Sequence, residues 1–103
     1  MATLASLRTL LEHIHSYGNC SQILAETSEL FDQPQGWFFR LLNNTIVSLI
    51  DDVDLFYGVS QDNPSPVLHE ISLAAIHGIA AIELNDVEEL NSAAEELSRL
   101  QKP

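Results

Sequence analysis

The sequence predicts an all-α protein, a compact antiparallel bundle of four to five helices in a single domain over residues 1–103. Three observations lead to this prediction. Apolar residues recur at intervals of three and four, the spacing of one helix face. No segment alternates apolar and polar residues as a half-exposed strand does. Most periodic segments are joined by short connections, which place consecutive helices side by side in opposite directions.

The central element is a helix predicted over Trp37–Tyr57. Its apolar face carries residues three or four apart, namely Phe38, Leu42, Ile46, Leu49, Val53 and Phe56. Gly58 follows, and glycine is common just past a helix end. A strand over residues 45–50 is the alternative, because Thr, Ile and Val favour sheets. Strict alternation is missing there, so we favour a helix and expect the other helices to pack around it.

Two shorter helices are expected before this central one. The first is predicted over residues 3–17, with Thr3 or Ser6 as its N-cap and Gly18 after its end. Asn19 and Gln22 have the spacing of a capping box, so the second helix is predicted to begin there and to reach about Phe31.

Two further helices are expected after a loop over residues 58–66. Pro66 fits the first turn of a helix that reaches Leu84 and is apolar almost all round. Such a helix has to be covered on most sides, either by its own domain or by a second copy. Asn85 and Glu88 resemble another cap pattern, which opens the last helix. The inner face of that helix is predicted to carry Val87, Leu90, Ala94, Leu97 and Leu100.

The charge of the chain is strongly negative. Fifteen acidic residues and four basic ones give a formal net charge of −11. Nucleic acids and anionic membranes bind clustered Lys and Arg, so neither is expected as a direct partner. A basic protein partner, cation binding or simple solubility are all compatible with this charge.

The sequence features that bear on location predict a soluble cytoplasmic protein. Cys20 is the only cysteine, so no intramolecular disulfide is expected. The N-terminus lacks the basic region of a signal peptide. The longest apolar run, Ile71–Ile82, is interrupted and is shorter than a membrane span.

Asp51, Asp52 and Asp54 form an acidic run in the last turns of the predicted central helix. The helix dipole disfavours acidic residues at that end by roughly 0.3–1 kcal/mol each. Breaks of local rules are often functional, so we consider docking of a partner's Arg or Lys, or a divalent cation. A divalent cation site needs oxygen ligands from more than one segment, and the sequence shows no second set of ligands beside this run. A solvated surface is the third interpretation.

Histidine and cysteine offer little support for catalysis or metal binding. Glu12 and His15 have the Glu-x-x-His spacing that di-iron bundles use on two helices, but it occurs here once. His69 and His77 would lie about 12 Å apart along one helix, too far to share a metal. Cys20 fits a small buried thiol. We therefore predict no enzyme activity, no cofactor and no metal site.

Three consecutive aromatic residues begin the central helix. Neighbours on a helix diverge by about 100 degrees, so Trp37, Phe38 and Phe39 cannot all face one core. Interfaces are enriched in Trp, Tyr and Arg, and Arg40 is adjacent. A surface that includes Trp37, Phe39 and Arg40 is one interpretation, and a helix buried on several sides is the other.

The function favoured by these observations is a non-catalytic, acidic protein-interaction module, an adaptor or inhibitor. Its partner would be a basic or nucleic-acid-binding protein, and mimicry of nucleic-acid charge is one form of that function. The predicted partner-binding residues are Asp51, Asp52, Asp54, Glu88, Glu89, Glu95, Glu96, Trp37, Phe39 and Arg40. One alternative is a homodimeric structural protein joined through the helix over residues 66–84, and another is a metal-binding bundle.

Overall fold

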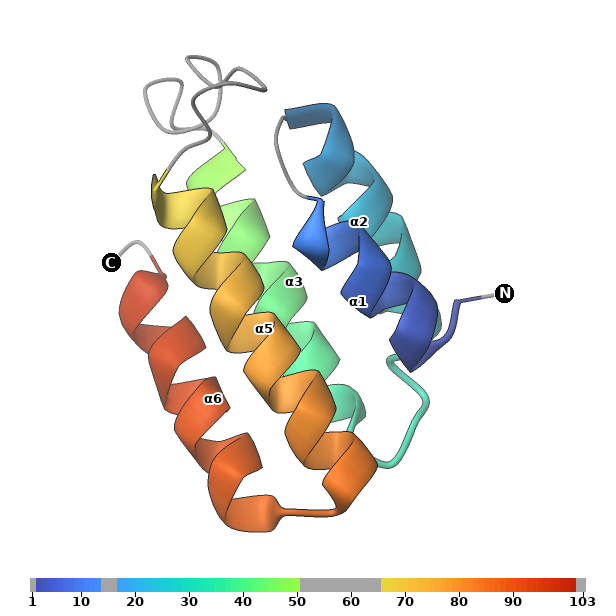
Figure 1. Ribbon diagram of the computed structural model, residues 1–103. Coiled ribbons are helices and arrows are strands. Elements are labelled where there is room, and N and C mark those ends of the chain that lie inside the picture. The colour runs from blue at the N-terminus through green and yellow to red at the C-terminus, as the bar shows by residue number, and fades with distance from the viewer. Residues whose placement is uncertain (1, 14–16, 51–65, 102–103) are drawn as a thin grey trace.

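The computed structural model describes residues 2–13, 17–50 and 66–101, and every regular element in these ranges is a helix (Figure 1). The helices are α1 (Leu4–Glu12), α2 (Tyr17–Glu29), α3 (Gly36–Ile50), α5 (Pro66–Leu84) and α6 (Val87–Leu100). Each helix runs opposite to the one before it, with α5 in front of α3 and flanked by α1 and α6. The closest packing is between α5 and α6, and α5 also contacts α1 and α3. The prediction of an all-α antiparallel bundle is confirmed.

The predicted boundary between the first two helices is wrong. The capping box at the start of α1 joins Thr3 and Ser6, each hydroxyl accepting from the other residue's N–H at 3.0 and 2.9 Å. However, α1 ends at Glu12, and both the predicted end and the predicted cap Asn19 lie within α2. Periodicity did not mark this break because apolar residues continue at helical spacing across it.

The helix predicted over Trp37–Tyr57 is confirmed, as α3, as far as the structure describes it. The expectation that the other helices pack around it is wrong, because α5 packs most extensively, against α1, α3 and α6, whereas α3 packs mainly against α2 and α6. Residues 45–50 belong to α3, so the strand alternative is wrong, whereas residues 51–57 and the predicted loop lie outside the described residues. The start of α3 requires glycine, because a Cβ on Gly36 would lie 1.9 Å from the Phe31 carbonyl oxygen. From there α3 brings fully buried side chains into the core at Phe38, Phe39, Leu42 and Ile46.

A sharp turn separates α5 from α6, so the two are not one continuous rod. Asn85 adopts a left-handed conformation with φ of 57°, which asparagine tolerates. The N–H groups of Asp86 and Asn85 donate to the Ala81 and Ile82 carbonyls at 2.9 and 3.1 Å, the pattern of a Schellman motif. The Asp86 carboxylate then accepts from the Glu89 N–H at 3.2 Å. The N-cap of α6 is therefore Asp86 instead of the predicted Asn85.

The bundle covers α5 on most but not all sides. Ile71, Ala75 and Ile79 are fully buried, whereas the side chains of Leu73 and Leu84 are 54% and 78% exposed. The stretch Val67–Leu84 is long and apolar enough to cross a bilayer, with 18 residues and a mean hydropathy of 1.5. The sequence argument from the shorter run Ile71–Ile82 therefore does not hold for the helix as a whole. The core helix of a bundle meets the same criteria, and 44% of this stretch is buried inside the molecule.

Candidate functional site: the acidic face of α6 and the groove at its start

One face of α6 is acidic and points away from the bundle. Leu90 and Leu97 are buried, and the residues on the opposite side of the helix include Glu88 and Glu95, both exposed. Glu95 pairs with Arg99 at 3.5 Å, but both side chains are more than 70% exposed, and such pairs contribute little. Among the described residues, no ion pair involves Glu88. We call Glu88 and Glu95 the outer acids of α6.

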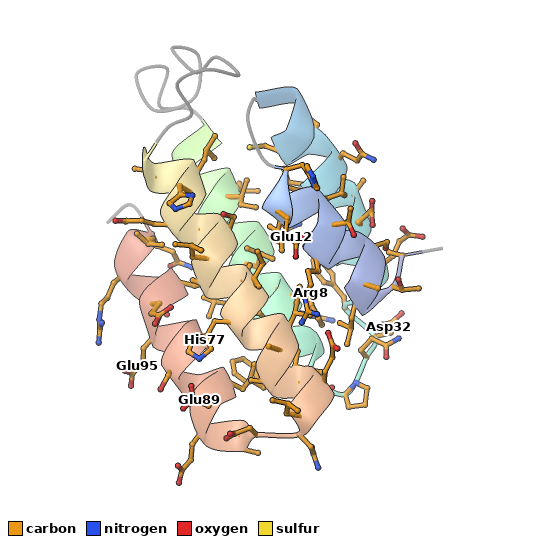
Figure 2. All side chains as sticks on the ribbon, in the orientation of Figure 1. Arg8, Glu12, Asp32, His77, Glu89 and Glu95 are labelled. Carbon is orange, nitrogen blue, oxygen red and sulfur yellow. The ribbon has the colours of Figure 1, made fainter. Side chains whose placement is uncertain are left out.

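The other two predicted acidic residues of α6 face α5. Figure 2 shows His77 of α5 beside Glu89 of α6. The His77 Nε2 lies 2.6 Å from a Glu89 carboxylate oxygen, and its Nδ1 lies 3.7 Å from one of Glu96. The hydrogen bond to Glu89 raises the pKa of His77 above 6.5, and the charge of Glu96 acts in the same direction. Glu89 and Glu96 therefore hold α6 against α5 and are less available to a partner than the outer acids.

The aromatic residues at the start of α3 separate as helical geometry requires. Trp37 is 46% exposed, whereas Phe38 and Phe39 are completely buried. The Phe38 ring meets its neighbours edge to face, with centroids 6.1 Å from Trp37 and 5.9 Å from Phe39. The expectation that the three do not all face one core is confirmed, and whether the exposed Trp37 binds a partner stays a prediction. For Phe39 the assignment to a binding surface is corrected, because its side chain has no solvent contact.

Arg40 lies on the surface but interacts with its own chain. Its guanidinium carbon is 5.2 Å from the centroid of the Phe31 ring, within the range of a cation–π contact. Phe31 follows α2, so the contact links the connection between α2 and α3 to the first turns of α3. Arg40 is exposed, and whether a partner contacts it stays a prediction.

Trp37 also lines a shallow groove that sequence reasoning missed. The groove has a volume of about 220 Å³ and lies between the start of α3 and the turn from α5 to α6. Its walls are formed by Pro34, Gln35, Trp37, Ala81, Ile82, Asn85, Asp86, Val87 and Leu90. Val87 was predicted on the inner face of the last helix, but it is 65% exposed at the first helical position. A third exposed apolar residue, Leu84, precedes the turn.

Only some of the other residues considered for metal binding, docking or catalysis lie in the described part of the chain. Asp51, Asp52, Asp54 and His15 lie outside the described residues. Within residues 2–13, 17–50 and 66–101, no three His, Cys, Asp or Glu side chains are grouped to hold a metal ion. Cys20 is buried, and burial raises the pKa of its thiol to about 11. The thiol is therefore protonated at neutral pH and is a poor nucleophile.

Comparison of the chain with protein-family models, curated proteins and solved structures finds no match. The function proposed below therefore depends on the geometry, exposure and charge of this chain alone. The described surface combines exposed carboxylates with exposed apolar side chains beside a groove. Such a combination is suited to binding.

Proposed function

We propose that this protein is a non-catalytic interaction module that docks on a basic surface of a partner protein through α6. The main support is the exposure of the outer acids, Glu88 and Glu95, on the face opposite the core. The formal net charge of −11 would speed association with a basic partner by attracting it over a distance.

The packing of α6 favours this use of its outer face. Contacts of His77 with Glu89 and Glu96 join α6 to α5, and Leu90 and Leu97 anchor it in the core. Because α6 is packed into the bundle, the backbone that carries these carboxylates is already ordered before binding. The partner would be a basic protein, including proteins that bind nucleic acid, and the module would act as an adaptor or inhibitor. Asp51, Asp52 and Asp54 remain predicted partner-binding residues on the basis of the sequence alone.

The outer acids can be tested with the double variant Glu88→Gln and Glu95→Gln. Tagged protein is used to capture partners from a lysate of the source organism, and the beads are washed at low and then at high salt. We expect a basic protein to be retained by the wild type at low salt and released at high salt. The double variant should retain about tenfold less, because charge complementarity is lost at the docking face.

A matched control removes the same charge elsewhere. Glu12 and Glu29 are exposed on α1 and α2, so Glu12→Gln and Glu29→Gln together give the same net charge. This control should retain the partner like the wild type. Equal retention by the two double variants would exclude α6 as the docking face.

A second candidate function is self-association through α5. Leu73 and Leu84 are exposed, and Ile76 and Ala80 are half-buried, at the three- and four-residue spacing of one stripe. A homodimer would use this stripe, because Ala75 and Ile79 on the other side of α5 are buried. Sedimentation of the wild type and of Leu73→Glu tests this function. A dimer that becomes a folded monomer in the variant supports it, whereas a monomeric wild type contradicts it.

A further inference from the structure

We propose that the groove beside Trp37 is an anchor pocket for a large apolar side chain flanked by Arg or Lys in a partner segment. This inference rests on the proposed function and specifies what the partner must present. The groove walls come from the start of α3 and from the turn between α5 and α6. The pocket therefore adjoins the first turn of the helix that carries the outer acids.

Exposed apolar side chains concentrate at this end of the bundle. The described residues include five large hydrophobic side chains that are exposed; two of them, Trp37 and Val87, line the groove, and a third, Leu84, precedes the turn that forms one of its walls. Exposed apolar surface that gathers in one place is typical of interaction sites. Tryptophan is among the residues that most often dominate binding energy at interfaces. The exposed indole of Trp37 is therefore suited to pack against a partner's side chain.

The size of the groove indicates what it can accept. Pockets for cofactors and small molecules are usually about 300–1,000 Å³. The volume here is about 220 Å³, which suits one or two side chains of a partner better than a cofactor. The floor is also rigid, because Ala81 and Leu90 are buried and the turn is fixed by the Asn85 and Asp86 hydrogen bonds. A preformed pocket costs little to organise on binding.

Charge at the rim selects the residues that flank the anchor. Asp86 lines the groove and Glu88 follows in the first turn of α6, both exposed. The described arginines are directed elsewhere: Arg8 pairs with Glu83 at 2.8 Å, Arg40 lies over Phe31, and Arg99 pairs with Glu95. Arg or Lys beside the anchor would meet carboxylates, whereas a second copy of this acidic chain would be repelled. A basic partner segment therefore fits this rim better than another copy.

Trp37 provides a direct test because it is the only tryptophan in the chain. The probe is a short synthetic peptide in which leucines alternate with arginines, titrated into the full chain. We expect saturable binding that shifts the Trp37 emission to shorter wavelength, because the bound leucine covers the indole. The same peptide with every leucine replaced by serine should bind at least about tenfold more weakly, because serine buries no comparable apolar surface in the groove.

Single variants locate the peptide on the protein. Val87→Ser removes apolar surface from the groove wall at an exposed position, so the fold should stay intact while the affinity falls about three- to tenfold. Val47→Ser is the matched control, because Val47 is an exposed valine of α3 that does not line the groove. This control should bind the peptide as the wild type does. Circular dichroism verifies that both variants are folded.

The results separate the groove from the broader function. Equal affinity of the wild type and Val87→Ser would overturn the anchor pocket. Equal affinity for the leucine and serine peptides would overturn it as well. In either case, peptide binding that still weakens in the Glu88→Gln, Glu95→Gln variant leaves the acidic docking face standing. If no basic peptide binds and no basic partner is captured from lysate, the pocket and the proposed function both fail.

Discussion

At the scale of single residues, Gly78 of α5 allows the Phe38 side chain of α3 to pack closely against α5. A Cβ at position 78 would lie 2.0–2.6 Å from three atoms of the Phe38 ring, which is fully buried. The ring therefore lies directly against the backbone of α5. Glycine within a helix costs about 1 kcal/mol relative to alanine, and here the close packing of Phe38 offsets that cost.

Gly78→Ala is predicted to destabilise the protein even though alanine is the better helix former. Overpacking a core costs about 1–3 kcal/mol, and contacts as short as those to the buried Phe38 ring place the cost in the upper part of that range, above the gain in helix propensity of about 1 kcal/mol. The free energy of unfolding should therefore fall by about 1–2 kcal/mol in urea titrations followed by circular dichroism. Ala80→Gly, at a half-buried position of the same helix, gives the cost of a glycine without the contact. An unchanged or higher stability of Gly78→Ala would show that Phe38 moves aside easily.

Side-chain pairing at this scale was only partly predictable. The hydroxyl at Thr3 was predicted as a cap and forms one, because capping depends on residues three apart in the sequence. The partner of Arg8 is Glu83, far away in the sequence, and the partners of His77 lie on another helix. Local spacing contains no information about such pairs.

At the scale of elements, His77 joins α5 to α6. Its ring lies beside Glu89 (Figure 2), and its second nitrogen lies 3.7 Å from a carboxylate oxygen of Glu96. The hydrogen bond to Glu89 raises the pKa of His77 in the folded state above the usual histidine value of 6.5. Because the folded protein binds this proton more tightly than the unfolded chain, protonation of His77 stabilises the fold.

The contribution of His77 should therefore depend on pH in a defined direction. It is fully present below the unfolded pKa of about 6.5 and is lost as the pH rises through the higher pKa of the folded state. Below about pH 6.5 the wild type should be more stable than His77→Gln by about 0.5 kcal/mol, a value typical of exposed ion pairs. The difference should vanish at alkaline pH. Denaturant titrations of both proteins across this range measure it. A difference that grows with pH would contradict this assignment.

Periodicity predicted the existence of the helices, but it did not predict for every helix which side faces the core. The spacing of Leu90 and Leu97 correctly assigned the buried side of α6. The sequence of α5 is apolar almost all round, so its pattern did not tell that Ile79 is buried whereas Leu73 is exposed. The groove depends on the contact of α3 with the distant turn at Asn85, which no local pattern reveals. This is why Trp37 was identified as a surface candidate but its neighbour Val87 was missed.

At the scale of the whole molecule, the negative charge is little compensated on the described surface. Of the eleven acidic residues that the structure describes, Glu83 and Glu95 pair with arginines, and Glu89 and Glu96 contact His77. The described arginines are all engaged within the chain. A basic partner would therefore meet an acidic surface without nearby free arginines to oppose it. This charge distribution distinguishes the proposed docking from simple apolar association.

The most direct test of charge-driven docking is the salt dependence of the affinity for the leucine–arginine peptide. Trp37 fluorescence reports binding at about 50 and 300 mM NaCl, where the screening length falls from roughly 14 to 6 Å. We predict that the affinity of the wild type falls at least about tenfold, and that it falls much less in the Glu88→Gln, Glu95→Gln variant. Equal affinity at both salt concentrations would contradict the proposal and would show that apolar contact alone drives binding.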